Sequence, residues 1–144
     1  HSSTIRRPDT VGLLDQPVRP YKETACISVL VNINGVDAYV LIDSGSTTNS
    51  MTPEFAHATR APRITLTEQV TLQLGCVGSR SRINYGTRVP IDFGGLKGHV
   101  YFDQVNLDRY DCILGTPLLN RHGGVIDFFR RELHLSNGRS IPAI

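Results

Sequence analysis

Apolar and polar residues alternate along much of the chain after residue 25, which predicts a series of short strands. Every second residue from Ile27 to Ile33 is apolar, the spacing of a strand with one buried face. Asn34-Gly35 follows, and both residues tolerate the positive φ of a tight hairpin turn. The alternation returns at Ala38 and closes into the solid apolar run 40–42. Such a run is typical of a strand buried on both faces.

The same pattern predicts more strands downstream, separated by glycine-containing turns. These strands are expected at 70–74, 83–85, 89–93, 100–102, 110–114, 125–129 and 132–135. Gly94-Gly95 and Asn137-Gly138 are the predicted turns of the second half. A break at 75–79 is typical of a turn that can open and close.

Two short helices are predicted by a threonine followed by proline. Thr52 can cap a helix that begins at Pro53 and ends near residue 59. Thr116 repeats this start, and Gly123 ends the second helix. Each helix follows an apolar strand and a turn of small residues, at 39–59 and again at 110–122, which is a weak internal repeat. The fold class is therefore all-β with two short helices.

Length and composition favour one soluble domain. Residues 1–22 are polar and proline-containing and are predicted to form an extended arm or linker, with the folded domain at 23–144. The net charge of +2 is too small to favour nucleic acid as a partner. No apolar run approaches the ~20 residues of a membrane span, and we expect neither a membrane anchor nor a signal peptide.

Cysteine and histidine spacing gives no framework for disulfides or metals. The three cysteines include no CxxC pair, which favours free thiols in a reducing compartment. The histidines at 57, 99, 122 and 134 lack the spacing of zinc ligands, so we expect no metal and no cofactor. A serine triad at Ser44 is disfavoured because the chain has no nucleophile elbow.

The main candidate for chemistry is the turn Asp43-Ser44-Gly45-Ser46-Thr47, directly after the buried run. A carboxylate at the end of a buried strand is costly unless it is paired, hydrogen-bonded or functional. Gly45 permits a sharp turn that aims N–H groups at this carboxylate. Taken alone, these residues also fit a plain turn or a phosphorylated degradation signal. The second alternative needs an exposed segment, which the run 40–42 disfavours.

The segment from Val40 to Thr47 resembles the active-site strand and turn of retropepsins, the aspartic proteases of retroviruses and long-terminal-repeat retrotransposons. Cys112-Ile113-Leu114-Gly115, followed by a predicted helix, is similar to the second signature of that family and lies roughly 70 residues downstream. The segment between them resembles the flap, with its tip at Gly75 to Arg80. The resemblance covers roughly 24–136 and is closest to Ty3/gypsy-type elements, with cellular ubiquitin-linked retropepsins next.

The resemblance implies a closed β fold completed as a two-fold homodimer. Asp43 of each copy would supply one of two carboxylates that share a proton and activate a water. Ser44 would hydrogen-bond across the dimer, and Gly45 would offer its carbonyl to an extended peptide. The apolar tail 133–144 is a candidate for a sheet between the subunits.

The same resemblance implies a set of substrate-binding residues in the floor, the flap and the subsite walls. They are Ser46, Thr47, Gly75, Cys76, Val77, Gly78, Ile83 and Ile113. This chain departs from many relatives at Thr47 and at Thr116-Pro117, where an acidic residue and a charged or polar partner are common. Both positions are uncharged here, so both ends of an ion pair would have been lost together.

Three arginines near the flap, at 80, 82 and 88, fit a solvated hairpin face, with a preference for acidic residues beside the cut as the alternative. The function expected from the resemblance is processing of a retroelement polyprotein, in the cytoplasm or in a virus-like particle. Two alternatives stay open: a non-catalytic module for peptide binding or dimerisation, and a cellular retropepsin in protein turnover.

Overall fold

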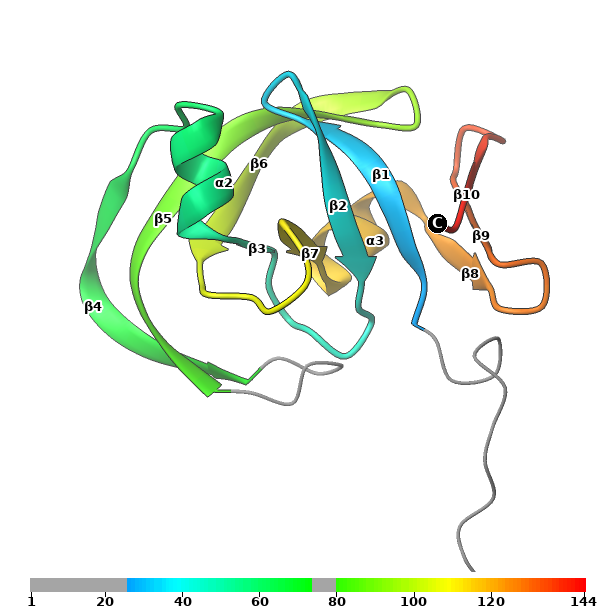
Figure 1. Ribbon diagram of the computed structural model, residues 1–144. Helices are drawn as coiled ribbons and strands as arrows, with labels where there is room; N and C mark the ends of the chain where they lie inside the picture. Colours follow the sequence, from blue (N-terminus) through cyan, green and yellow to red (C-terminus); the bar gives the residue numbers. More distant parts are fainter. Residues whose placement is uncertain (1–25, 74–79) are drawn as a thin grey trace, which may run out of the picture.

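The computed structural model describes residues 26–73 and 80–144 (Figure 1). The predicted arm at 1–22 and the flap residues 75–79 lie outside this part of the chain. The main sheet is formed by β1 Ser28–Ile33, β2 Val36–Ile42, β3 Ser50–Met51, β4 Ile64–Gln73, β5 Arg80–Phe93, β6 Leu96–Gln104 and β7 Cys112–Leu114. A second sheet contains β8 Val125–Asp127, β9 Glu132–His134 and β10 Ser140–Pro142. The helices are α2 Pro53–Ala58 and α3 Thr116–His122.

The main sheet closes on itself, so the all-β prediction with two short helices is confirmed for the described residues. Its strand order is β1-β2-β7-β3-β6-β5-β4, and β1 also pairs with β5 through Asn32 with Asp92 and Ile33 with Ile91. This extra pairing closes six strands into a barrel, while β4 extends β5 outward (Figure 1). A closed sheet leaves no open edge among those six strands.

The hairpin turns form where positive φ was predicted. Asn34 and Gly35 have φ of 53° and 85°, and they join β1 to β2 in the expected antiparallel register. Gly94 and Gly95 have φ of 59° and 92° between β5 and β6. These turns need residues that adopt positive φ at little cost in conformational energy. The turn sets the register of the two strands, and the register determines which face of each strand is buried.

The first helix begins as predicted, and the second does not. The N–H of Phe55 donates to the hydroxyl of Thr52 at 3.0 Å, which caps α2. In α3, however, Thr116 is already the first helical residue, and Gly115 is the cap position without a side-chain bond. The physical reason is that the N–H of Thr116 donates to the carbonyl of Ser46 at 2.9 Å. Contact with the Asp43 turn, and not a local cap, therefore fixes the start of α3.

The tail is paired within its own chain, and the predicted sheet between subunits stays a prediction. β10 pairs antiparallel with β9, and Leu133 and Leu135 are buried in the main core. The N–H of Ile144 donates to the carbonyl of Ser28 at 2.8 Å. Leu133 and Leu135 are therefore buried within one chain, while Ile141 is half-buried and Ile144 is exposed.

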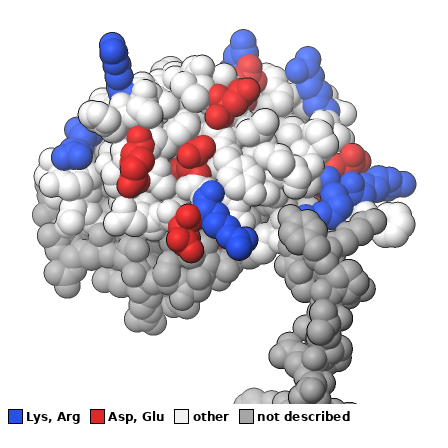
Figure 2. All heavy atoms as spheres, viewed as in Figure 1, with Lys and Arg blue, Asp and Glu red and all other residues white. Residues whose placement is uncertain are grey.

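Charged side chains are distributed over the described surface. On the face in Figure 2, acidic and basic side chains are interspersed, and neither sign forms a continuous patch there. Within the described residues, no helix is long and apolar enough to cross a membrane.

Candidate active site

Asp43 sits where two parallel strands from distant parts of the chain lie side by side. β2 pairs with β7 in the register Val40 with Cys112 and Ile42 with Leu114. The backbone N–H of Asp43 extends this pairing by donating to the carbonyl of Leu114 at 3.0 Å. The side chain is 3% exposed. The two apolar runs that suggested an internal repeat are therefore direct neighbours, and together they mount the carboxylate.

The turn after Asp43 folds back onto its carboxylate. The N–H of Gly45 donates to Oδ1 of Asp43 at 2.9 Å, and the N–H of Ser46 donates to the backbone carbonyl of Asp43 at 3.1 Å. The predicted role of Gly45 in aiming an N–H group at Asp43 is thus seen in the geometry. Ser44, Gly45 and Thr47 are exposed, so the turn presents one face to the outside.

Ser46 is an internal support of this loop. Its side chain is fully buried, and its hydroxyl donates to the carbonyl of Thr48 at 2.9 Å. Its own carbonyl accepts the N–H of Thr116. Because the hydroxyl and the carbonyl of Ser46 both have internal partners, the structure describes Ser46 as a residue that holds the loop. Its predicted contact with substrate stays a prediction.

The loop 43–49 crosses over Gly115, and the crossing leaves no room for a side chain. A Cβ at residue 115 would overlap the carbonyl oxygen of Thr48 and would lie 2.5 Å from that of Ser46. The N–H of Gly115 donates to Oδ1 of Asn49 at 3.0 Å. The glycine of the second signature is therefore required by close approach of two backbones.

A buried carboxylate on β6, which the sequence reading missed, holds the far end of the loop. Oδ2 of Asp103 accepts the hydroxyl of Thr48 at 2.8 Å, and Oδ1 accepts the hydroxyl of Tyr101 at 2.8 Å. The backbone N–H of Asp103 donates to the carbonyl of Asn49 at 2.9 Å. A charged residue at the buried end of an apolar strand was the available signal, because such a group needs partners.

Burial governs the ionisation of two groups near the loop. Burial, followed by the hydrogen bond and charge of Asp103, raises the pKa of Tyr101 far above its ordinary value. Burial, followed by the charge of Asp111, raises the pKa of the Cys112 thiol in β7 in the same way. Tyr101 is therefore a neutral hydrogen-bond donor, and Cys112 is a small apolar packing residue.

The predicted apolar subsite walls are packed together beneath the site. Ile83 and Ile113 are fully buried and form a small cluster with Leu41 and Val105. This cluster supports β2 from the side opposite the main core, and a role of Ile83 and Ile113 in binding peptide stays a prediction. The residues predicted to bind substrate from the flap, Gly75, Cys76, Val77 and Gly78, lie outside the described residues.

One group with metal-binding residue types occurs away from this loop, on β8 and β9. Nε2 of His134 lies 3.4 Å from Oδ2 of Asp127 and 3.3 Å from Oε1 of Glu132. The Arg130 guanidinium lies 3.3 Å from the same Asp127 oxygen. Hydrogen bonds from Arg130, above all from its backbone N–H, and from His134 lower the pKa of Asp127. Charge pairing accounts for this arrangement.

The close backbone crossing at Gly115 leads to a prediction about stability. We expect Gly115→Ala to destabilise the protein by at least about 1–3 kcal/mol, because the added methyl group must displace backbone carbonyls. Thermal unfolding measures the loss, and amide chemical shifts locate it at 43–49. Gly98→Ala is the matched control, since a Cβ at Gly98 meets nothing within 4 Å. Equal stability of the two variants would contradict the crossing.

Tyr101 makes a prediction about pH. Its folded pKa is raised, so the folded state keeps a proton that the unfolded chain releases near pH 10. Stability from this hydroxyl is therefore present below about pH 10 and is lost as pH rises toward the folded pKa. Ultraviolet titration should show a tyrosine that ionises well above pH 10. Asp103→Asn should bring that pKa partly back toward 10, and an unchanged titration curve would count against the contact.

Comparisons with known proteins agree with this geometry. Residues 39–140 match the family model of the PEG10/RTL1 protease domain. The retroviral protease-like domain of Ddi1 from Leishmania major is 19% identical, with a TM-score of 0.60 over 84% of this chain and 95% of that one. EIAV protease, solved with the inhibitor HBY-793, is 21% identical, with a TM-score of 0.54 over 72% of this chain and 93% of that one.

These two structural likenesses show the fold and confirm it as retropepsin-like. None of the curated proteins compared with the chain matches it. The matched family segment contains the Asp43 loop, Asp103 and the Gly115 crossing. The chain therefore belongs to the PEG10/RTL1 protease domain family.

Proposed function

We propose that this chain is one half of an aspartic endopeptidase, in which Asp43 of two identical subunits forms the catalytic pair. The observation that supports this most directly is the mounting of Asp43. A carboxylate that is 3% exposed ends a buried strand, accepts the N–H of Gly45, and lies in a loop locked around Gly115. Burial of a charged group at such cost fits a group held for chemistry.

The chemistry needs two carboxyl groups with one proton between them. The ionised carboxylate takes a proton from water, and the resulting hydroxide oxygen bonds to the peptide carbonyl carbon. The protonated partner donates its proton to the carbonyl oxygen, which gives a neutral tetrahedral diol. In the collapse of the diol, the carboxyl that took the proton from water gives it to the nitrogen, the C–N bond breaks, and the other carboxylate takes a proton from a diol hydroxyl as the carbonyl re-forms. Like charges this close do not both ionise, so the pair keeps one proton, and we expect the fastest hydrolysis at mildly acidic pH.

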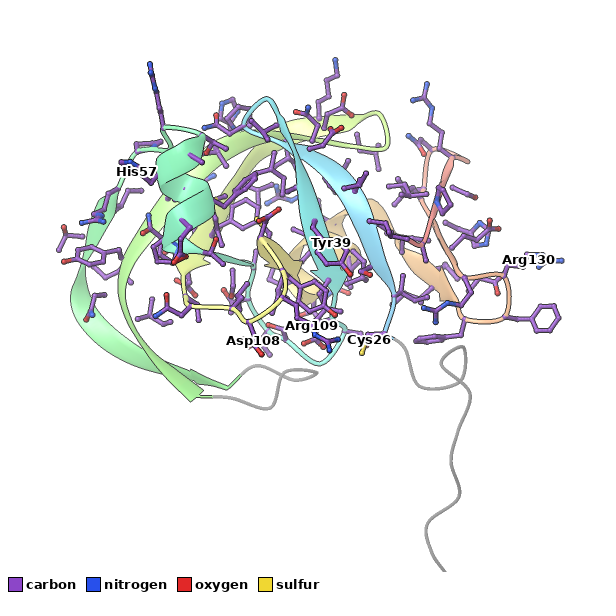
Figure 3. The ribbon with its side chains drawn as sticks, in the orientation of Figure 1. Cys26, Tyr39, His57, Asp108, Arg109 and Arg130 are labelled. Atoms are coloured by element: carbon purple, nitrogen blue, oxygen red, sulfur yellow. The ribbon has the colours of Figure 1, made fainter. Side chains whose placement is uncertain are left out.

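A second copy must supply the second aspartate, because the sequence holds one Asp-Ser-Gly motif. One corner of the molecule is continuous with the Asp43 loop and is available for that contact. The Arg131 guanidinium donates to the carbonyl of Cys26 at 3.1 Å, and the carbonyl of Arg131 accepts the N–H of Ala143. The carbonyl of Ile27 in turn accepts the N–H of Ile42, which precedes Asp43. Figure 3 shows Cys26 near the loop that follows β2, with Arg130 beyond it on the β8–β9 hairpin.

We name this region the terminal corner: residues 26–28, 128–131 and 143–144. It exposes large apolar side chains, with Phe128 62%, Phe129 84% and Ile144 58% exposed. A covered aromatic ring buries ~150–250 Å², so four rings across a two-fold contact would supply several hundred Å². That is a large part of the ~1,200 Å² at the lower limit of stable interfaces. A second copy of this chain is the occupant that the chemistry itself requires.

The substrate of this proposal is an extended polypeptide. A peptide lying along the exposed face of Ser44, Gly45 and Thr47 can gain backbone hydrogen bonds as an added strand. We propose processing of a retroelement polyprotein, in the cytoplasm or in a virus-like particle, as its task. A non-catalytic peptide-binding module would use the same exposed face without needing Asp43, and a single substitution separates the two.

We expect Asp43→Asn to abolish peptide hydrolysis, with a loss of at least roughly 10²–10⁴-fold, because an amide cannot exchange the shared proton. Circular dichroism and solution mass should stay those of the parent. Asp37→Asn, at an exposed position of β2, is the matched control and should keep full activity. Hydrolysis that survives in the Asp43 variant would refute the assignment.

The terminal corner makes a separate prediction. Replacing Phe128 and Phe129 together with serine should weaken the dimer by at least ~30-fold, because buried aromatic anchors each carry about 2 kcal/mol or more. Sedimentation over a concentration series gives the dissociation constant. Activity should be lost on dilution and recover at high concentration. Leu30→Ser, at an exposed apolar position of β1, is the control. A mass curve that is unchanged in the double variant would exclude this corner as the interface.

A further inference from the structure

A small polar cavity lies on the α3 side of the Asp43 loop, away from the exposed turn. Its volume is about 150 Å³, and its lining includes Thr48, Arg88, His99, Tyr101 and Arg121. These residues are far apart in the sequence. The register of β5 with β6 brings three of them together, because it pairs Arg88 with Tyr101 and places His99 two residues before Tyr101 on the same face. Arg121 comes from the last turn of α3.

The cavity is basic because its cations have no acidic partners. Neither Arg88 nor Arg121 forms an ion pair with a carboxylate of the described residues. The nearest acidic group on this face of β6 is Asp103, and its two oxygens already accept the hydroxyls of Thr48 and Tyr101. Thr47 and Thr116 add no charge at the loop or at the start of α3. Neither guanidinium group that lines the cavity is ion-paired with a carboxylate of the described residues, and the Asp103 carboxylate reaches the lining through its hydrogen bonds with Thr48 and Tyr101.

The size of the cavity and the geometry of its hydrogen-bond donors indicate which class of ligand it can bind. A cavity of about 150 Å³ has the volume of roughly five waters, and it is smaller than the ~300–1,000 Å³ of sites for drug-sized molecules. The guanidinium group presents paired N–H donors that match phosphate oxygens, and both Arg88 and Arg121 line this cavity. We infer that this cavity binds a phosphate group, either inorganic phosphate or the phosphate of a phosphorylated side chain.

This site goes beyond the proposed proteolysis and does not depend on it. The cavity touches the Asp43 loop only through Thr48 and Asn49, whose side chains are tied to Asp103 and to Gly115. Binding can therefore be measured in an Asp43→Asn background, where no peptide is cut. Failure of hydrolysis and failure of phosphate binding are then separate results.

The test is a titration of the ¹⁵N-labelled Asp43→Asn protein with inorganic phosphate at pH 7, with chloride adjusted to hold ionic strength constant. We expect saturable shifts of the amides of Thr48, Asn49, Tyr101 and Arg121. Arg88→Gln and Arg121→Gln should each weaken binding about tenfold, since a lost charge-assisted hydrogen bond has that effect. Arg60→Gln, at an exposed arginine just after α2, is the control and should bind as the parent does. Binding that is unchanged in the double variant, or shifts that chloride alone reproduces, would overturn the site.

Titrations with peptides distinguish the two sources of the phosphate group. A phosphoserine peptide that binds tenfold more tightly than inorganic phosphate, with shifts at the same amides, identifies a phosphorylated side chain. Equal affinities identify free phosphate, and both results support the site. A peptide with glutamate in place of phosphoserine should bind at least tenfold more weakly. Equal binding of the glutamate peptide would overturn the assignment to phosphate.

Discussion

The close crossing of the loop 43–49 over Gly115 is the contact on which the rest of the site depends. β2 and β7 run parallel, so the chain leaving β2 must pass over the end of β7 before it returns as β3 on the other side of that strand. The crossing is possible because residue 115 has no side chain. The crossing holds the carboxylate of Asp43 at the ends of two buried strands, β2 and β7. Closure of the barrel through β1 and β5 holds those strands in place.

The polar groups of this loop are satisfied mostly by one another, and this gives the loop its rigidity. The Ser46 hydroxyl donates a hydrogen bond to the Thr48 carbonyl, and the Thr48 hydroxyl donates one to Asp103. The Asn49 side-chain oxygen accepts one from the N–H of Gly115. A buried polar group without a partner costs more than a satisfied one gains, so each bond restricts the next residue. Among the described residues, Ser50 Oγ is the buried side-chain atom without a hydrogen-bond partner. A catalytic carboxylate benefits from such a mount, because its orientation is fixed before substrate arrives.

The sequence predicted those parts of the fold whose causes are local. The left-handed turns at Asn34-Gly35 and Gly94-Gly95 and the cap at Thr52 depend on a few adjacent residues, and all three were found. The start of α3 and the strands β3 and β10 depend on partners far along the chain. β3 has two residues and no period of its own, and its place is set by pairing with β6 and β7.

The candidate site divides in the same way. Asp43 could be predicted because a solid apolar run leads directly into an Asp-Ser-Gly turn. Asp103 could not be assigned a role, because its distant partner Thr48 is brought to it by the parallel pairing of β3 with β6, while Tyr101 is two residues away on β6 itself. The basic cavity has the same origin, since the two arginines and the histidine at 88, 121 and 99 have no common pattern in the sequence.

The internal pairing of β10 changes which surface can join two subunits. β9 already has a neighbour on each side and Leu133 is fully buried, so the strands of this sheet that can still pair with a second copy are the edge strands β8 and β10. Large apolar groups in this region are exposed at the β8–β9 turn and at the last residue, and Val125 is exposed on β8. The β8–β9 turn is linked to Cys26 by the Arg131 side chain, Ile144 is linked to Ser28 by a backbone hydrogen bond, and the carbonyl of Ile27 accepts the N–H of Ile42 at the end of β2. A contact made there can therefore hold two copies of the Asp43 loop in a fixed relation, while the cavity beside α3 stays open to a different ligand.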